Sequence, residues 1–153
     1  MDRVSDVAVA VESTVDALVS VLESAGLGQG PTVPPAQLRV LTIVAGKQHT
    51  NMSRLAEALE VVPSSASRLC DRLEATGLLR RVPDPRDRRE VRLLLTPAAR
   101  RLLDELRDLR RRALEEVLGQ MPAGDRDALV RSLRSFATAA AVDGAEDQSR
   151  RTA

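Results

Sequence analysis

Apolar residues repeat every three or four positions near both ends of the chain, which is the spacing of an amphipathic α-helix. The first stretch predicts a helix over residues 4–22, followed by a glycine-rich segment at 26–30. The second stretch predicts a long helix that Thr96 caps and a last helix that begins near Asp125. The stripes consist of Val4, Val7, Val11, Val15, Leu18 and Leu22, then Leu102, Leu103, Leu106, Leu109, Ala113, Leu114, Val117 and Leu118, and finally Leu129, Val130, Leu133, Phe136 and Ala137.

Between these stretches the pattern predicts three shorter helices and a β-hairpin. Residues 36–46 are apolar on nearly every side, which predicts a short helix buried among others. Asn51 is a good cap for the next helix. A fourth helix begins at Pro63 and runs to about Gly77, because proline suits the first helical position and glycine suits the position after a helix end. Two short strand-like runs follow before Thr96.

The helix predicted from Pro63 has two different faces. Ala66, Leu69, Cys70 and Leu73 share an apolar stripe that we expect to be buried. A face of small hydroxyl groups and arginines can approach a DNA duplex closely and hydrogen-bond to phosphates and base edges, although an ordinary exposed helix face has the same periodicity. The polar positions are Ser64, Ser65, Ser67, Arg68 and Arg72.

Charge changes this picture only locally. The formal net charge is +1, so attraction to nucleic acid cannot rest on the whole chain, and a nonspecific architectural DNA binder is disfavoured. Between Arg80 and Arg92, however, six arginines stand against three acids. Lys47 is the sole lysine, so arginine is preferred throughout the chain and individual arginines prove little.

Composition excludes several classes of protein. At 153 residues with 43% apolar content, the sequence predicts either one domain or one compact domain with an oligomerisation arm. The single cysteine, Cys70, excludes an intramolecular disulfide, and neither a secretory signal nor a membrane-spanning run is present, so we expect a cytoplasmic protein without a membrane partner. We find no motif of an enzyme, and the lone His49 cannot form a zinc site with one distant cysteine, so no metal or cofactor is expected.

The order of residues from Leu73 to Thr96 resembles that of the MarR family of bacterial transcriptional regulators. The resemblance covers about residues 35–97 and implies a mainly α fold with a small β-hairpin wing, a winged helix-turn-helix core and terminal helices that form a dimerisation region. The corresponding parts are 1–30 for the N-terminal dimerisation helix, 31–97 for the DNA-binding domain, 98–142 for the C-terminal dimerisation helices and 143–153 for a disordered polar tail. The residues that carry it are Leu73, Gly77, Leu78, Leu79, Arg81, Asp87, Arg88, Arg89, Val91, Leu93, Leu95 and Thr96.

The resemblance also implies a function and its residues. The chain would regulate transcription, as a repressor, by binding a pseudo-palindromic double-stranded DNA operator as a homodimer, and a small-molecule effector could release it. Asp87 would fix the wing, Arg89 would enter a minor groove, and Arg86 and Arg88 would contact phosphates. The recognition helix would contribute Ser64, Ser65, Ser67, Arg68 and Arg72, and Asn51 and Ser53 would touch the DNA backbone.

Two positions depart from the family pattern. Val62 stands where relatives commonly have a serine or threonine cap, and Glu60 occupies a turn position that is often glycine. Relatives are often switched by anionic or phenolic small molecules bound between the dimer helices and the DNA-binding lobe. Because Phe136 is the sole aromatic residue, we do not expect an aromatic-lined effector pocket here.

Three alternatives stay open from the sequence. A winged-helix dimer that acts by protein–protein interaction would share the same fold, although the presence of Asp87 and Arg89 speaks against it. A thiol-based redox regulator would use Cys70, whose place on the apolar stripe favours a buried and unreactive core residue instead. A monomeric six-helix bundle is the alternative to the dimer.

Overall fold

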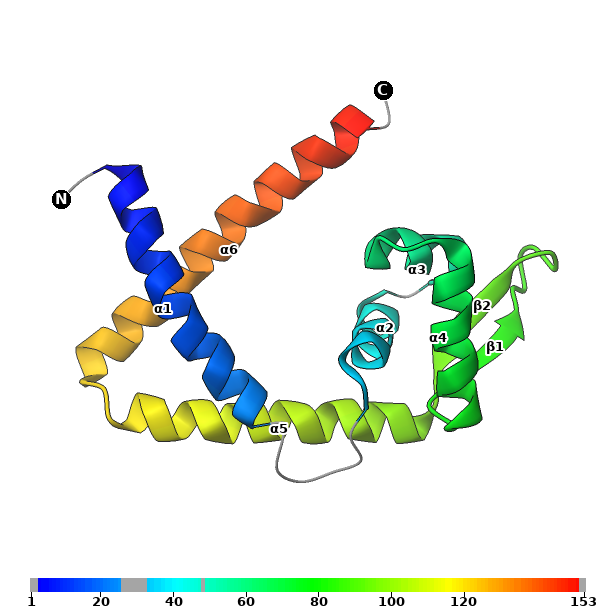
Figure 1. Ribbon diagram of the computed structural model, residues 1–153, viewed down its shortest axis with the longest axis horizontal. Helices are drawn as coiled ribbons and strands as arrows, with labels where there is room; N and C mark the ends of the chain where they lie inside the picture. The colour runs from blue at the N-terminus through cyan, green and yellow to red at the C-terminus, as the bar shows by residue number, and fades with distance from the viewer. Residues whose placement is uncertain (1–2, 26–32, 48, 152–153) are drawn as a thin grey trace. The chain divides into compact units, whose positions relative to one another are not determined.

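The computed structural model of the chain describes residues 3–25, 33–47 and 49–151, without the side chains of 142–151 (Figure 1). The described residues form six helices and one antiparallel hairpin, which confirms the predicted fold class. The elements are α1 (Val4–Ser24), α2 (Pro35–Gly46), α3 (Met52–Leu59), α4 (Pro63–Ala75), β1 (Leu79–Pro83), β2 (Val91–Leu95), α5 (Pro97–Gly119) and α6 (Ala123–Arg151). The chain divides into two compact units, residues 1–111 and 112–153, which are described separately.

The hydrophobic core of the first unit lies among α2, α3, α4, the hairpin and the start of α5. Each of the three short helices contributes a buried stripe with helical spacing. Helix α2 is less buried than predicted, because its other side, with Arg39 and Thr42, is exposed. The predicted stripe of α4 is confirmed, because Leu69 packs against the core and its other three members are buried. The buried residues are Val40, Leu41, Val44, Leu55, Ala56, Leu59, Ala66, Cys70, Leu73, Leu79, Leu93, Ala99 and Leu103.

The end of α4 is shaped by glycine, as expected. The amide of Gly77 donates to the Glu74 carbonyl at 2.9 Å, and the amide of Leu78 donates to the Leu73 carbonyl at 2.9 Å. This pair of hydrogen bonds is the Schellman motif, which places one residue in the left-handed region. That residue is Gly77, with φ of 71°, so the missing side chain has a structural reason.

Helix α3 ends in the same way, but without glycine. The amide of Val61 donates to the Ala56 carbonyl at 3.1 Å, and the amide of Glu60 donates to the Glu57 carbonyl at 3.0 Å. Glu60 therefore has a φ of 56°, and among the described residues it is the only non-glycine in the left-handed region. The departure noted at this position in the sequence thus leaves the turn geometry intact and costs backbone strain instead.

We expect Glu60→Gly to stabilise the protein by about 0.5–1 kcal/mol, because relief of the left-handed strain outweighs the added entropy of the unfolded chain. Gly77→Ala should destabilise it by about 1 kcal/mol, because it puts a side chain at a left-handed position. The cost is not steric, since an added methyl group would meet no neighbouring atom within 4 Å. Urea unfolding followed by circular dichroism measures both changes. Glu60→Ala is the matched control: it keeps a side chain at the strained position, and a gain equal to that of Glu60→Gly would refute the strain.

The hairpin pairs β1 with β2 in a register that runs from Leu79 opposite Leu95 to Pro83 opposite Val91. On its other edge, β2 also contacts the segment before α3. The amide of Leu93 donates to the Thr50 carbonyl at 2.9 Å, and Asn51 forms a β-bridge with Arg92. Strand β2 is therefore paired along both edges, with β1 on one edge and with the segment before α3 on the other.

The starts of the last two helices differ in how well the sequence predicts them. Thr96 caps α5 as expected, since its Oγ1 accepts a hydrogen bond from the Ala99 amide at 3.2 Å and donates one to the Gly77 carbonyl at 2.7 Å. Helix α6 begins at Ala123, before the predicted cap Asp125. Instead of capping, Asp125 lies in the first turn, where its negative charge suits the positive end of the helix dipole.

Helix α6 also continues through residues 143–151, where the sequence predicts a disordered tail. The stretch lacks proline and extends a helix that has already formed, so each added residue gains a backbone hydrogen bond without a new nucleation cost. Residues 152 and 153 lie outside the described part of the chain. None of the described helices has both the length and the apolar character that a membrane span requires.

Candidate nucleic-acid interface

Helix α4 presents one continuous polar face. Ser64, Arg68 and Arg72 are all exposed and follow one another at four-residue spacing, so they lie along the same side of the helix. Ser65 is half-buried beside them. The helix begins without a side-chain cap, because its N-cap is Val62, as the sequence indicates. The face therefore combines hydroxyl and guanidinium donors with the positive end of a helix dipole.

Ser67 differs from the other predicted contacts on α4. It is half-buried, and both its carbonyl oxygen and its Oγ accept hydrogen bonds from Nη2 of Arg81, at 3.2 and 3.3 Å. Nη1 of Arg81 donates to Asp71 Oδ1 at 2.7 Å and also to Glu74 Oε2. The backbone amide of Arg81 donates to the other oxygen of Glu74, Oε1, at 2.9 Å. Strand β1 is thus joined to α4 through one arginine.

The positive charge of Arg81 faces two carboxylates of the same unit, those of Asp71 and Glu74. The side chain of Arg81 is 24% exposed, and Glu74 is 33% exposed. Partial burial alone would lower the pKa of the guanidinium, but the hydrogen bonds and negative charges of Asp71 and Glu74 raise the pKa above its ordinary value. Arg81 is therefore an internal cation, although the sequence places it in the same run as the exposed arginines.

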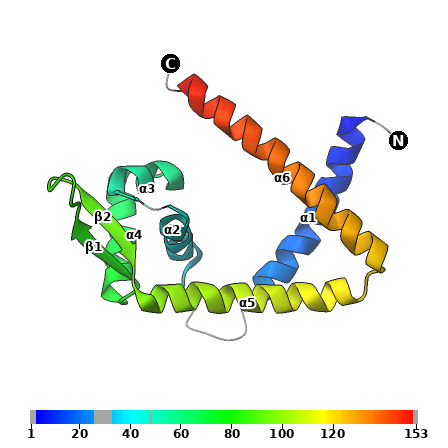
Figure 2. The same ribbon diagram turned by 180° about the vertical axis from the view of Figure 1, so that it is seen from behind.

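The loop between the strands, residues 84–90, is called the wing loop below, and it extends from the free end of the hairpin (Figure 2). Asp84 accepts a hydrogen bond from the Arg86 amide at 2.7 Å, and Asp87 accepts one from the Arg89 amide at 2.9 Å. Each aspartate thus folds the backbone two residues ahead of it. The hydrogen bond of Asp87 agrees with the loop-fixing role that the family resemblance implies.

Asp84 also closes the base of the wing loop. Its amide donates to the Glu90 carbonyl at 2.9 Å, and its Oδ2 lies 3.8 Å from Nε of Arg92. The hydrogen bond from the Arg86 amide lowers the pKa of Asp84 against the opposing effect of desolvation, and the Asp87 amide and the charges of Arg92 and Arg86 add to the lowering. Because the folded pKa is depressed, the stabilisation is present at neutral pH and is lost only as pH falls through that lowered pKa.

The six arginines between Arg80 and Arg92 fall into two groups according to their exposure. Arg81 and Arg92 have partly buried side chains that face acids of the same unit. The others have exposed side chains, three of them on the wing loop and one on β1. These exposed arginines are Arg80, Arg86, Arg88 and Arg89.

The two residues predicted to touch the DNA backbone differ in their surroundings. Asn51 Oδ1 caps α3 by accepting from the Arg54 amide at 2.9 Å, and its Nδ2 donates to Glu90 Oε2 at 3.0 Å. Both polar ends of Asn51 are thus used inside the protein, where they connect α3 to the wing loop. Ser53 is exposed on the first turn of α3.

Cys70 and His49 lie in opposite environments. Cys70 is fully buried, and desolvation raises the pKa of its thiol to about 11 in spite of the nearby Arg81 charge. His49 is exposed in the loop before α3, where its carbonyl accepts a hydrogen bond from Arg54 at 3.3 Å. Within the described residues, no group of acidic, histidine or cysteine side chains could hold a metal ion.

We expect the Cys70 thiol to resist a disulfide reagent such as DTNB in the native protein at pH 7.5, because burial blocks access and the thiolate is a very small fraction at that pH. In urea the same thiol should react at the rate of an exposed cysteine. The measurement is the absorbance of released thionitrobenzoate over time. Native labelling as fast as labelling in urea would restore the redox-sensor alternative.

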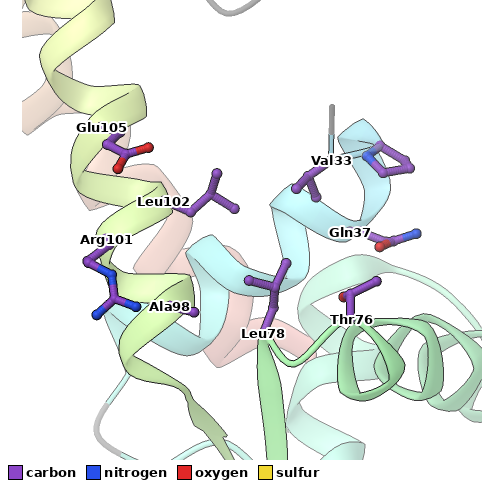
Figure 3. Close-up of a pocket in the computed structure, with 9 residues that line it drawn as sticks. Val33, Gln37, Thr76, Leu78, Ala98, Arg101, Leu102 and Glu105 are labelled. Atoms are coloured by element: carbon purple, nitrogen blue, oxygen red, sulfur yellow. The ribbon is translucent and has the colours of Figure 1, made fainter. Parts of the chain in front are cut away.

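A cavity of about 480 Å³ lies between α2, the end of α4 and the start of α5 (Figure 3). Val33, Leu78 and Leu102 point toward one another and provide its apolar wall. Arg101 and Glu105 lie on the α5 side, while Gln37 and Thr76 lie on the α2 and α4 side (Figure 3). The residues that line this cavity are aliphatic, polar or charged.

Sequence reasoning missed the internal roles of Arg81, Glu74 and Asp84. The Asp-x-Arg spacing occurs twice in the wing loop, at Asp84 and at Asp87, and this repeat was the available signal for both turns. Nothing comparable marks the pair of Arg81 and Glu74. They lie seven residues apart across a helix end, and their contact depends on how β1 leaves α4.

Comparison with known proteins gives matches in both sequence and structure. A sequence model described as MarR family matches residues 32–90. The HTH-type transcriptional repressor MdtR of Bacillus subtilis is 41% identical over 64 residues, which cover 42% of this chain and 41% of MdtR. The HTH-type transcriptional repressor NicR of Pseudomonas putida is 31% identical over 101 residues, which cover 65% of this chain and 64% of NicR. The matches therefore span less than two thirds of either relative.

The structural match extends over more of the chain. The crystal structure of RV1404 from Mycobacterium tuberculosis superposes with a TM-score of 0.79 and 29% identity, covering 92% of this chain and 97% of RV1404. The residues that match the family model contain α2, α3, α4, β1 and the wing loop, and the match ends just before β2. Together with the observed order of helices and strands, these matches show that residues 32–90 are similar to the MarR family in sequence and that the chain shares the fold of RV1404.

Proposed function

We propose that the chain is a transcriptional repressor that binds a double-stranded DNA operator as a homodimer. The observation that carries the proposal is that two exposed surfaces rich in hydrogen-bond donors, on α4 and on the wing loop, belong to the same compact unit. The polar face of α4 suits a major groove, and the wing loop presents exposed arginines beside it. The names of MdtR and NicR, both HTH-type transcriptional repressors, support this function and the prediction that the chain is not an enzyme.

The proposed DNA contacts come from three surfaces: α4, the wing loop and the first turn of α3. We assign Ser64, Arg68 and Arg72 to direct contact with the major groove, because they share the exposed face of α4. The half-buried Ser65 and Ser67 would lie at the edge of that contact. In the wing, Arg89 would enter the minor groove while Arg86 and Arg88 neutralise phosphates. Ser53 and the first turn of α3 would meet the DNA backbone, and Asn51 would act there mainly as the cap.

The proposed dimer rests on apolar surface that a single chain leaves exposed. Val4 is 87% exposed on α1, and Phe136 is 67% exposed on α6. Soluble proteins rarely leave such stripes uncovered, and a second copy of the chain would bury them symmetrically. Further exposed apolar residues of these stripes are Val7, Val11, Val15, Leu18, Val117, Leu129, Val130 and Leu133. A regulator of this kind would work in the cytoplasm, where the DNA is.

Selection of bound sequences from random duplex DNA tests the proposal directly. A homodimer should enrich a pseudo-palindrome whose half-sites are about one helical turn apart, since two recognition helices then enter successive major grooves. Arg68→Ala, Arg89→Ala and the double variant serve as controls and should reduce the enrichment. If the wild-type protein forms a folded dimer and enriches no sequence, the proposal fails and the protein-interaction alternative takes its place.

We also propose that a small-molecule effector binds in the cavity beside α5. Its aliphatic wall and the guanidinium of Arg101 suit an aliphatic carboxylate better than an aromatic ring. Octanoate should raise the melting temperature and release the selected duplex. Ala98→Leu, which narrows the cavity, and Arg101→Ala should both abolish these effects while DNA binding persists. If octanoate changes the melting temperature and duplex binding of the wild-type protein and of both variants equally, it binds outside this cavity.

A further inference from the structure

Arg81 connects the two surfaces that are proposed to read DNA. Five hydrogen bonds run from this one residue on β1 to Ser67, Asp71 and Glu74 on α4. Together these three acceptor residues occupy two turns of the recognition helix. Four of the five bonds come from the guanidinium and one comes from the backbone, so both the side chain and the strand itself are held.

On the basis of the proposed function, we propose that Arg81 is a positioning residue that fixes the wing relative to the recognition helix, so that major-groove and minor-groove contacts form together. Nη1 and Nη2 already donate inside the protein, which leaves little of the guanidinium for phosphate. The residue next to it, Arg80, is exposed and available to DNA. The contribution of Arg81 to DNA binding is therefore geometric.

The planar fork of arginine is needed for this role. One guanidinium reaches a helix carbonyl, a serine hydroxyl and two carboxylates at the same time. A lysine ammonium carries the same charge but has no fixed fork, so it cannot hold all of these acceptors in one geometry. Arg81→Lys therefore separates charge from geometry.

A variant of Glu74 distinguishes the two explanations, because they predict opposite changes in DNA affinity. Its two carboxylate oxygens accept from the amide and from the guanidinium of Arg81. If the acids of α4 acted only through charge, Glu74→Gln would tighten DNA binding, because it removes a negative charge near the phosphates. If Glu74 holds the wing through Arg81, the same variant weakens binding, since an amide has only one oxygen to accept both hydrogen bonds.

The first measurement is affinity for the duplex that the wild-type protein selects. We expect a loss of about tenfold or more for Arg81→Lys and for Arg81→Ala, and a smaller loss for Glu74→Gln, with the dimer intact. Arg80→Ala is the matched control, which should lower affinity through charge and should reduce its salt dependence. Tighter binding by Glu74→Gln, or wild-type affinity of Arg81→Lys, would overturn the inference.

A double-mutant cycle separates positioning from simple loss of folded protein. If Arg81 presents the wing, Arg89→Ala should cost much less affinity in the Arg81→Ala background than in the wild-type background. A variant that is merely part-unfolded has less active protein, and the factor by which Arg89→Ala lowers affinity then stays the same in both backgrounds. An unchanged factor would therefore refute the positioning role even if Arg81→Ala weakens binding.

The second measurement needs no DNA. Spin labels on Arg72→Cys and Arg88→Cys, in the Cys70→Ala background, report the distance between α4 and the wing loop in the full chain. The distribution should be narrow with Arg81 and broader with Arg81→Lys. If the unlabelled wild-type protein binds no duplex and the labelled proteins still show the broadening, the proposed function falls and the mechanical role of Arg81 stands. Identical distributions would remove the role of Arg81 and leave the proposed function standing.

Discussion

Leu133→Asp is expected to convert the homodimer to a monomer and to lower operator affinity by about 10²- to 10⁴-fold. Leu133 is 47% exposed in the single chain and lies one turn from Phe136 on α6. A charge at this position would be buried without a partner in the dimer but would stay hydrated in the monomer. The affinity falls steeply because binding of the second half-site changes from an intramolecular to an intermolecular event.

Light scattering coupled to gel filtration measures the mass, and a fluorescence titration of the selected duplex measures the affinity. Ser135→Asp is the matched control, because it adds the same charge to an exposed position two residues away, on another side of α6. The control should remain a dimer with wild-type affinity. A wild-type protein that is monomeric at micromolar concentration, or a dimeric Leu133→Asp protein, would contradict the proposed interface.

The helices of the first unit could be predicted well because their ends are encoded locally. Pro63 and Gly77 mark α4, Asn51 caps α3, and Thr96 caps α5, and each acts through its own side chain or backbone within a few residues. The predicted start of α6 is too late because Asp125 has the chemistry of a cap, whereas the carbonyl of Pro122 already accepts the amides of the first turn.

The candidate site was predictable as a region but not residue by residue. Charge counting treats all arginines between Arg80 and Arg92 alike, whereas the fold turns Arg81 and Arg92 toward acids and leaves the others exposed. Which side of a strand faces the helix depends on register, and the register is set by how Leu79 and Leu93 enter the core. The strain at Glu60, in contrast, could be predicted residue by residue, because the sequence has glutamate at a turn position that is often glycine.

Arg89→Ala is expected to lower operator affinity by about 30- to 1000-fold, because each dimer carries two copies and each loses roughly 1–2 kcal/mol of groove contact. Arg89 is exposed on the wing loop, and the Asp87 carboxylate fixes the backbone at its amide. The loss should be greatest on duplexes with A-tracts outside the half-sites, since a narrow minor groove has the stronger negative potential. Titration of matched A-tract and G·C-rich duplexes measures the difference.

Arg88→Ala is the control, because it removes the same charge from the next exposed position of the wing loop. If Arg88 binds a phosphate, its removal should weaken all duplexes alike and should reduce the magnitude of the log–log salt slope by about 0.9 for each phosphate that is no longer neutralised. Arg89→Ala should instead erase the preference for A-tracts. The assignment of groove and phosphate roles is reversed if Arg88→Ala erases that preference, and it fails if neither variant does. With the fold and dimer intact in both variants, such a result would leave α4 as the sole source of sequence selectivity.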